Sequence, residues 1–197
     1  MPRERAVVAT RSEHKLRELR EILDSLELMP LPDELELPPE DGKTFADNAL
    51  IKARAVQAAT GRAAIADDSG IEVRTLGGRP GVRSARYAGS DATDAENLEL
   101  LLREIDGADD RSAAYVCALA HVDADGAEHL FEGRCEGTLA REPRGSGGFG
   151  YDPAFVPADT GPDDPRTMAE LSSAEKHAIS HRGRAARRLA RWLEGRR

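Results

Sequence analysis

Two adjacent carboxylates, Asp67 and Asp68, stand between a short apolar run and the pair Ser69-Gly70. Successive side chains of a strand point to opposite faces, so one carboxylate could enter a core network while the other faces a cleft. Burial of both without a cation would be costly, and a carboxylate in a cleft could bind Mg2+ and orient a water molecule. Because Asp, Ser and Gly also favour turns, a plain turn is the alternative that composition alone favours.

A second candidate is the segment from Thr10 to Lys15, which lies between a predicted strand and a predicted helix. At such a junction, free backbone N–H groups and the positive end of the helix dipole attract an anion, and Lys15 adds a formal charge. The segment predicts a phosphate-binding corner, although it lacks the glycines of a Walker A loop. A capped helix with a surface lysine explains it equally well. The residues of this segment are Thr10, Arg11, Ser12, Glu13, His14 and Lys15.

Glu40 and Asp41 form an acidic turn ahead of Gly42. Taken alone, they are typical of a solvated surface turn. They gain interest only if the fold brings them beside Asp68, since Mg2+ usually takes one or two protein carboxylates together with phosphate oxygens.

A glycine-rich loop spans residues 145–153 and holds two of the chain's few aromatic residues, Phe149 and Tyr151. Glycines let the backbone approach a ligand closely. The two rings offer flat faces to a base, and Asp152 offers hydrogen-bond acceptors. Stacking of a base on an aromatic ring contributes roughly 1–3 kcal/mol. The alternative is a flexible loop that is anchored by one buried ring.

Further along the chain, Lys176 and the sequence Ser180-His181-Arg182-Gly183 add cationic groups. Lys and Arg donate hydrogen bonds to phosphate or carbonyl oxygens, Arg through a planar fork. A His-Arg pair on a surface helix is the plainer explanation. The histidines show no spacing that is typical of metal ligands, so the sequence predicts no zinc site. They are His14, His121, His129, His177 and His181.

The elements that must position these residues follow from apolar periodicity and capping signals. A buried strand is predicted over residues 5–10, and apolar residues recurring on one face predict a helix over residues 13–26. Four prolines within residues 29–42 exclude a long helix there. Thr44 with Asp47 predicts the start of a second helix.

This second helix is expected over residues 48–59, with its end near Gly61. Strands are expected over residues 63–66 and 71–76, on either side of a break at 67–70. The remaining predictions are a structured loop over 77–89, a helix from Thr93 to Gly107, a hairpin of strands 113–122 and 128–134, a third strand over 136–142, a short helix after Ser172 and a last helix over 184–194. Strands and helices in this order predict an α/β or α+β fold with a mixed sheet, in a single domain over residues 1–197.

The composition is that of an ordinary globular protein, with 197 residues, 40% hydrophobic and 32% charged, and a net charge of −8. Such an acidic chain is a poor binder of a long duplex, so no nucleic-acid partner is expected. No apolar run is long enough to span a bilayer and no signal peptide is evident, which predicts a cytoplasmic protein without a membrane partner. Cys117 and Cys135 are expected to be small buried side chains rather than a disulfide scaffold.

Together, these segments resemble the inosine triphosphate pyrophosphatase family. The matching stretches recur in the family's order between Ala6 and Ala186, and the most specific are ADDSG with PGVRSARYAG, and GGFGYDP with SHRG. The resemblance implies an elongated mixed β-sheet flanked by helices, with two lobes and a central substrate cleft. It also implies a homodimer and Mg2+-dependent hydrolysis of ITP, dITP and XTP to the monophosphate and pyrophosphate, which cleanses the nucleotide pool.

The resemblance implies a role for each matching residue. Asp68 would be the catalytic carboxylate that binds Mg2+ and orients or deprotonates the attacking water, with Glu40 as a second metal ligand. Thr10 to Lys15 would bind the triphosphate, Lys52 would reach the phosphates, and Ser69 would contact the substrate. The residues implied in the base pocket, or in contacts with the base or phosphates, are Phe149, Gly150, Tyr151, Asp152, Lys176, His181 and Arg182.

Selectivity would follow from the 6-keto oxygen of hypoxanthine and xanthine, which Arg182 or a backbone N–H could bond and which adenine lacks. The sequence departs from the family's usual Gly-Asn at Arg11 and Ser12, which leaves their individual phosphate contacts open. The alternatives are a Maf-like pyrophosphatase for modified pyrimidine nucleotides, a phosphatase with an Asp67-Asp68 nucleophile, and a non-catalytic nucleotide or RNA sensor that uses the Arg-rich last helix. An assay of pyrophosphate release from ITP distinguishes these hypotheses, because a phosphatase would release orthophosphate and a non-catalytic sensor would release neither.

Overall fold

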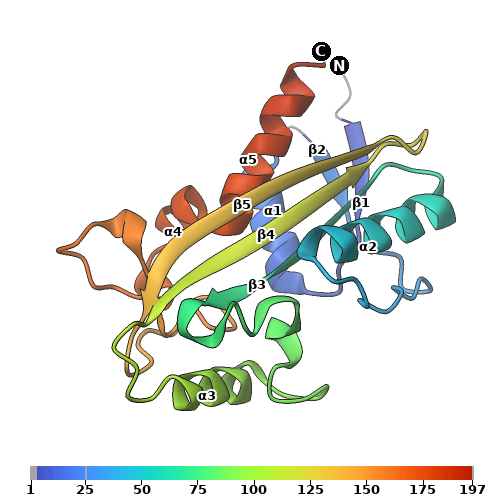
Figure 1. Ribbon diagram of the computed structural model, residues 1–197. Helices are drawn as coiled ribbons and strands as arrows, with labels where there is room; N and C mark the ends of the chain where they lie inside the picture. Colours follow the sequence, from blue (N-terminus) through green and yellow to red (C-terminus); the bar gives the residue numbers. More distant parts are fainter. Residues whose placement is uncertain (1–3, 25, 197) are drawn as a thin grey trace. The chain divides into compact units, whose positions relative to one another are not determined.

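The computed structural model describes residues 4–24 and 26–196. In this part of the chain, six strands form one sheet in the order β2-β1-β3-β4-β5-β6 (Figure 1). β1 (Glu4–Val8) pairs in parallel with β2 (Leu26–Met29) and with β3 (Ala64–Val73), whereas β5 (Glu128–Leu139) pairs antiparallel with β6 (Phe155–Pro157). The remaining elements are β4 (Ser112–Val122), α1 (Glu13–Ile22), α2 (Phe45–Thr60), α3 (Asp94–Glu104), α4 (Ser173–Ile179) and α5 (His181–Glu194). The predicted α/β class with a mixed sheet and flanking helices is confirmed.

The chain divides into two compact units. Unit 1 contains Met1–Asp68, Cys117–Gly133 and Arg182–Arg197, and unit 2 contains Ser69–Val116 and Arg134–His181. Strands β3, β4 and β5 each contribute residues to both units. The single domain over residues 1–197 stays a prediction.

The core of unit 1 is aliphatic and is built from β1, α1, β3, β4 and α5. Val8, Leu19, Ile65, Leu119 and Leu189 are fully buried in it. Each comes from a different element, so their burial fixes how these elements pack. The packing places the loop before α1 beside the β3 residues of this unit, where the candidate phosphate-binding and carboxylate residues lie.

The core of unit 2 has more aromatic character. Tyr115 and Phe155 lie with their ring centroids 4.7 Å apart, and Ile71, Leu101 and Met168 are buried with them. The glycine-rich loop leads into β6, so this core anchors one end of it. Both cysteines are buried, Cys117 in the core of unit 1 and Cys135 in that of unit 2, as the sequence predicts.

The predicted break at residues 67–70 is wrong, because β3 runs without interruption from Ala64 to Val73. The two aspartates accept partners from distant parts of the chain, which removes their need for local turn hydrogen bonds. Glycine is needed at position 70 of the strand, because a Cβ there would lie 2.4 Å from Ser84 Oγ and 2.5 Å from the Gly81 carbonyl oxygen. Tertiary contacts thus override the turn preference of Asp, Ser and Gly.

Three other predicted boundaries are corrected. The helix predicted over residues 13–26 ends at Ile22, because Leu26–Met29 pairs with β1 as strand β2. The strand predicted over 136–142 is instead the second part of β5, which continues to Leu139 and pairs with β6. The last helix begins at His181 rather than at residue 184.

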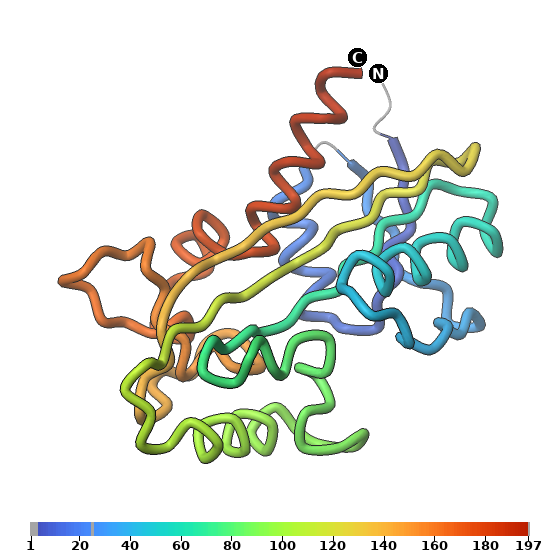
Figure 2. Tube along the Cα trace, viewed as in Figure 1, coloured from blue at the N-terminus to red at the C-terminus, as the bar shows by residue number. Residues whose placement is uncertain are grey.

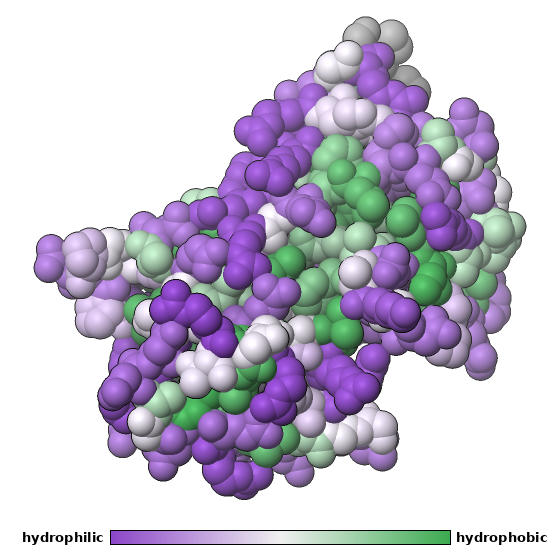
Figure 3. Space-filling view, in the orientation of Figure 1, coloured by the Kyte–Doolittle hydropathy of each residue, from purple (hydrophilic) through white to green (hydrophobic). Residues whose placement is uncertain are grey.

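The second helix follows its local signals. Thr44 caps α2 in a reciprocal capping box with Asp47, and Gly61 ends the helix. Among the described residues, none of the helices has the length and apolar character that a bilayer crossing requires. The face drawn in Figure 3 is mostly hydrophilic, with scattered apolar patches.

Candidate active site

Asp67 lies at the centre of a buried ion-pair network in unit 1. Its Oδ2 accepts hydrogen bonds from Arg182 Nη2 at 2.9 Å and Nε at 3.1 Å, and it lies 3.2 Å from Lys15 Nζ. Burial alone would raise the pKa of Asp67, but the charges of Lys15, Arg182 and Lys52 outweigh it and lower the pKa far below its usual range. Asp67 is therefore ionised, and its carboxylate forms ion pairs with Lys15 and Arg182.

Asp68 points to different partners, as strand geometry requires. Its Oδ2 accepts a hydrogen bond of 2.9 Å from Asn48 Nδ2, and the Oδ1 of Asn48 accepts one of 2.8 Å from the backbone N–H of Gly42. Asn48 thus ties the acidic turn to Asp68. Burial raises the pKa of Asp68 and the charge of Glu40 adds to this, against the Asn48 hydrogen bond and the charges of Lys52 and Lys15. A raised pKa marks a carboxyl that is suited to binding a cation or accepting a proton.

Glu40 and Lys52 form an ion pair beside Asp68. Lys52 Nζ donates to Glu40 Oε1, and it also donates to the backbone oxygen of Asp67 at 2.8 Å. Burial alone would lower the pKa of Lys52, but the charges of Asp67 and Glu40 raise it, so the amine is protonated. The oxygen-only donor set of Asp68 and Glu40 fits a hard cation such as Mg2+.

The loop before α1 has the predicted capping geometry. Ser12 Oγ accepts from the backbone N–H of Lys15 at 3.4 Å, and Thr10 Oγ1 accepts from that of Ser12 at 3.1 Å. Glu13 and His14 are exposed, and His14 Nδ1 lies 2.9 Å from an Arg17 nitrogen. Lys15 is the residue of this segment whose side chain reaches the carboxylate network.

Arg11 binds the proline-rich connection. Its guanidinium donates to four backbone carbonyl oxygens, those of Leu31, Pro32, Asp33 and Leu35, at 2.6 to 3.3 Å. The planar fork of Arg11 presents several N–H donors to these carbonyls at once. Arg11 thus stabilises residues 31–35, and its predicted substrate contact stays a prediction.

Arg182 is part of the same buried network. It is only 1% exposed, and its Nη1 donates to Glu18 Oε2 at 2.6 Å while Nε and Nη2 bind Asp67. These contacts hold Asp67 in position. The predicted contact of Arg182 with a 6-keto oxygen stays a prediction.

The glycine-rich loop of unit 2 is organised around Asp152. Asp152 Oδ2 accepts from the backbone N–H of Phe149 at 2.9 Å and from Lys176 Nζ at 2.8 Å. The Lys176 ammonium also lies 4.8 Å from the centre of the Phe149 ring. His181 stacks on Tyr115, with ring centroids 4.6 Å apart and an interplanar angle of 7°. These contacts give the loop a defined conformation.

Tyr151 and Gly150 anchor this loop. The hydroxyl of the buried Tyr151 donates to the Ser84 carbonyl at 2.7 Å, and the Gly150 N–H donates to Asp94 Oδ2 at 2.7 Å. The ring of Tyr151 is packed in the core of unit 2, and its predicted contact with a base stays a prediction. Phe149 remains as the half-buried ring of the loop.

A pair of glycine substitutions tests this organisation. Gly148 and Gly150 both have positive φ, +71° and +62°, but a Cβ at Gly148 would lie 2.1 Å from Asp152 Oδ2, whereas one at Gly150 meets no described atom within 4 Å. We expect Gly150→Ala to lower the free energy of unfolding by about 1–3 kcal/mol through backbone strain, and Gly148→Ala by a further ~1–3 kcal/mol. Urea unfolding measures both, and equal losses would contradict the role given to Asp152.

The structure therefore brings the predicted residues together in two sets. Lys15, Glu40, Lys52, Asp67, Asp68 and Arg182 share unit 1, whereas Phe149, Asp152, Lys176 and His181 share unit 2; Ser69 follows Asp68 in β3 but is assigned to unit 2. Sequence reasoning missed Glu18, Asn48 and Asp94. A polar Asn48 on the buried face of an alanine-rich helix was a usable signal, whereas Glu18 had none.

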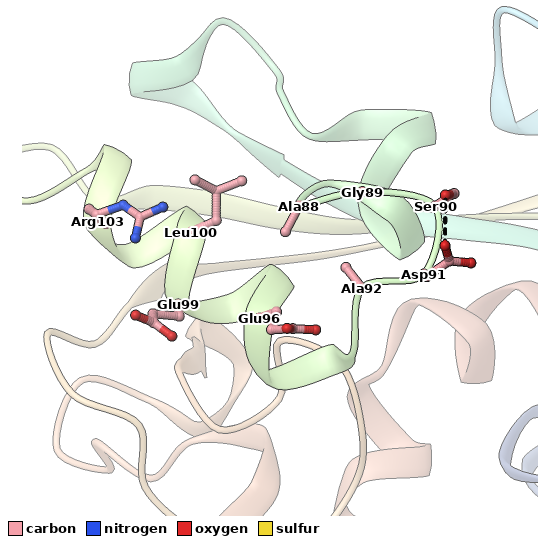
Figure 4. A pocket seen from close by; sticks show the side chains of 9 residues that line it. All are labelled: Ala88, Gly89, Ser90, Asp91, Ala92, Glu96, Glu99, Leu100 and Arg103. Atoms are coloured by element: carbon pink, nitrogen blue, oxygen red, sulfur yellow. Dashed lines mark hydrogen bonds between the residues drawn. The ribbon is translucent and has the colours of Figure 1, made fainter.

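A pocket in unit 2 contains none of the predicted residues. It is lined by the segment after Tyr87 and by α3 (Figure 4), including Ser90, Glu96, Glu99 and Arg103. Another pocket is lined by α3 and residues 145–150 of the glycine-rich loop, so Phe149 and Gly150 border a hollow surface.

Comparison with known proteins gives consistent matches over nearly the whole chain. The model of the Ham1 family matches residues 6–192. A dITP/XTP pyrophosphatase of Mycobacterium tuberculosis (strain H37Rv) is 53% identical over 188 residues, 91% of this chain and 90% of that protein. One of Corynebacterium diphtheriae is 49% identical over 205 residues, 97% of each.

Solved structures agree with these matches. A HAM1 protein from Coxiella burnetii is 41% identical with a TM-score of 0.85, covering 98% of this chain and 99% of that one. A nucleoside-triphosphatase / dITP/XTP pyrophosphatase from Mycobacterium abscessus is 48% identical with a TM-score of 0.75, covering 94% of this chain and 98% of that one.

Proposed function

This chain belongs to the Ham1 family, and from that premise we propose that it hydrolyses nonstandard purine nucleoside triphosphates, namely ITP, dITP and XTP, to the monophosphate and pyrophosphate. Family membership confirms the resemblance that the sequence motifs indicate. The observation that carries the chemistry is the buried Asp68, whose pKa is raised, with Glu40 and Lys52 beside it. We further propose that the enzyme cleanses the nucleotide pool of the cytoplasm as a homodimer.

Asp68 is the proposed catalytic carboxylate. Attack at the α-phosphorus needs a water whose proton is accepted as the bond forms, and a carboxylate with a raised pKa is the better base for it. Mg2+ bound by Asp68 and Glu40 would supply the positive charge that stabilises the leaving pyrophosphate. Asp67 lies on the other face of the strand, and its Oδ2 binds Lys15 and Arg182, so it is not the proposed base.

The phosphate contacts are assigned to the loop before α1. Backbone N–H groups at the start of a helix and the Lys15 ammonium attract an anion. Thr10 and Ser12 belong to this loop, Glu13 and His14 to the first turn of α1, and Ser69 follows Asp68 as a further proposed substrate contact. Lys52 is proposed to hold Glu40 and the Asp67 backbone in place. From this position, the charge of the Lys52 ammonium also acts on the phosphates.

Phe149 is the proposed stacking partner of the base, with Lys176 and His181 as polar contacts. With Arg182 enclosed by carboxylates, the 6-keto oxygen is assigned to Lys176, whose ammonium carries three donors. Adenine has an amino group at the 6-position in place of the keto oxygen. In a complex with an adenine nucleotide, the Lys176 ammonium would therefore face another hydrogen-bond donor. Asp152 orients Lys176 and the backbone of Phe149 rather than reading the base itself.

A panel of triphosphates tests this proposal. With Mg2+, we expect pyrophosphate and the monophosphate from ITP, dITP and XTP, with kcat/KM for ATP lower by about 10²-fold or more. Chromatography of the products with separate assays of pyrophosphate and orthophosphate measures this. Orthophosphate release would favour the phosphatase alternative, a preference for modified pyrimidines the Maf-like one, and binding without hydrolysis the sensor.

A further inference from the structure

A second cluster of ligating side chains lies in unit 1, at the start of β1 and the end of β4. Glu4 begins β1, His121 lies near the end of β4, and Asp123 follows that strand; one ligand atom of each lies within 4.8 Å of the others. Figure 2 shows the start of the blue β1 trace near the yellow end of β4. Glu4 lies 117 positions before His121 in the sequence, so no sequence spacing reveals the cluster.

His121 gives the observation that points to a ligand. Its side chain is 0% exposed, and neither ring nitrogen forms a hydrogen bond with any residue in 4–24 or 26–196. A buried polar atom without a hydrogen-bond partner destabilises the fold, so such an atom calls for an explanation. A neutral imidazole nitrogen is a common ligand of divalent metals.

The distances within the cluster suit ligands of one ion. His121 Nδ1 lies 3.1 Å from Asp123 Oδ1 without forming a hydrogen bond. Two ligands at tetrahedral angles around zinc, each about 2.0–2.1 Å from it, lie about 3.3 Å apart. His129 Nε2 lies 3.5 Å from Asp123 Oδ2, so a second imidazole stands at the other oxygen of the same carboxylate.

The cluster is separate from the Asp68–Glu40 pair. The charges of Asp67 and Asp68 act on Cys117, which places that part of β4 beside the catalytic residues. His121 lies four residues further along β4, about 13 Å away at the rise of a strand. A metal at His121 would therefore be a second ion with different ligands.

We propose that Glu4, His121 and Asp123, with His129 as the fourth ligand, bind a borderline divalent cation such as Zn2+. Imidazole nitrogens together with carboxylates favour Zn2+ over Mg2+, which prefers oxygen ligands alone. The ion would fasten the start of β1 to the end of β4. The sequence-based expectation of no zinc site considered only spacings between histidines along the chain, which do not include a partner from β1 such as Glu4.

Arg196 occupies the position of a competing cation. Its Nη1 donates to both oxygens of Asp123, at 2.9 and 3.2 Å, while its guanidinium lies 4.5 Å from the Trp192 ring. The same Trp192 ring contacts His129 and His121, with centroid distances of 4.1 and 5.6 Å. Metal binding would displace this half-exposed guanidinium, so Arg196 weakens the affinity for the ion.

Titration of the full chain with Zn2+ tests the proposal. Protein stripped of metal is titrated calorimetrically in excess Mg2+, which occupies the oxygen site. We expect one Zn2+ per chain, at least about tenfold weaker binding in Asp123→Asn and Glu4→Gln, and tighter binding in Arg196→Ala. Asp125→Asn removes the same charge from an exposed position in the same turn and should leave the affinity unchanged.

Two further measurements decide the location and geometry. Co2+ in place of Zn2+ should show the intense visible absorption of four-coordinate cobalt, and this absorption should be lost in Asp123→Asn. Asp68→Asn should keep the Zn2+ affinity. Wild-type affinity in Asp123→Asn, or its loss in Asp68→Asn alone, would overturn the proposal by placing the ion elsewhere, and neither result depends on the identity of the nucleotide substrate.

Discussion

Replacement of Asp68 by asparagine is expected to lower kcat/KM for dITP by about 10²- to 10⁴-fold, the usual contribution of a positioned general base. The amide has the same shape, and its oxygen can still accept the hydrogen bond from Asn48. It cannot accept a proton at neutral pH and is a weaker ligand for Mg2+. Initial rates of pyrophosphate release at several substrate concentrations measure the effect.

The stability of the same variant distinguishes catalysis from folding. Because burial raises the pKa of Asp68, the ionised carboxylate opposes folding at neutral pH, and Asp68→Asn should leave Tm unchanged or higher. Asp41→Asn, which neutralises an exposed neighbour of Glu40, is the matched control and should keep full activity. Retention of more than about a tenth of the wild-type rate in Asp68→Asn would remove Asp68 from the catalytic role.

Arg182→Met should lower the free energy of unfolding by about 3–5 kcal/mol, because it leaves Asp67 and Glu18 buried with fewer cations. Urea unfolding measures this loss. Arg188→Met removes an exposed arginine from the same helix, and it should change stability by no more than about 0.5 kcal/mol. The fraction of Arg182→Met protein that remains folded should keep the wild-type preference for ITP over ATP. A loss of this preference would show that Arg182 contributes to base recognition.

The pH dependence gives this prediction a second readout. The pKa of Asp67 is far lower in the fold than its unfolded value of about 3.9, so its ion pairs stabilise the protein fully above that pH and less as the pH falls below it. Arg182→Met raises the pKa of Asp67 toward its ordinary value. The stability difference between variant and wild type should thus be largest at pH 7 and shrink below about pH 4. A difference that is constant with pH would contradict the ion-pair explanation.

Features that depend on neighbouring residues could be predicted from the sequence. Thr44, Asp47 and Gly61 mark both ends of α2, because capping satisfies backbone groups within a few positions along the chain. The strand–loop–helix order around Lys15 follows from apolar periodicity in the same way. The resemblance to a known family then indicated which of these loops carry the candidate site.

Features that depend on distant partners could not be predicted. The partners of Asp67 are Lys15 and Arg182, more than a hundred positions apart from each other, so the sequence alone suggested a turn where β3 is continuous. Arg11 and Arg182 have the charge of phosphate or base ligands, but carbonyl and carboxylate groups elsewhere in the fold take their donors. Residue type gave the chemistry available to each side chain, and only the packing decided which partner it met.

The burial of Cys117 has a practical consequence. Enclosure in β4 raises the pKa of this thiol to about 12, so almost none of it is thiolate at neutral pH. Oxidants and alkylating reagents act on the thiolate, and Cys117 should therefore resist both in the folded protein. A label that does attach to Cys117 would report that β4 has opened beside the aspartates, which makes this cysteine a probe of local unfolding next to the proposed catalytic carboxylate.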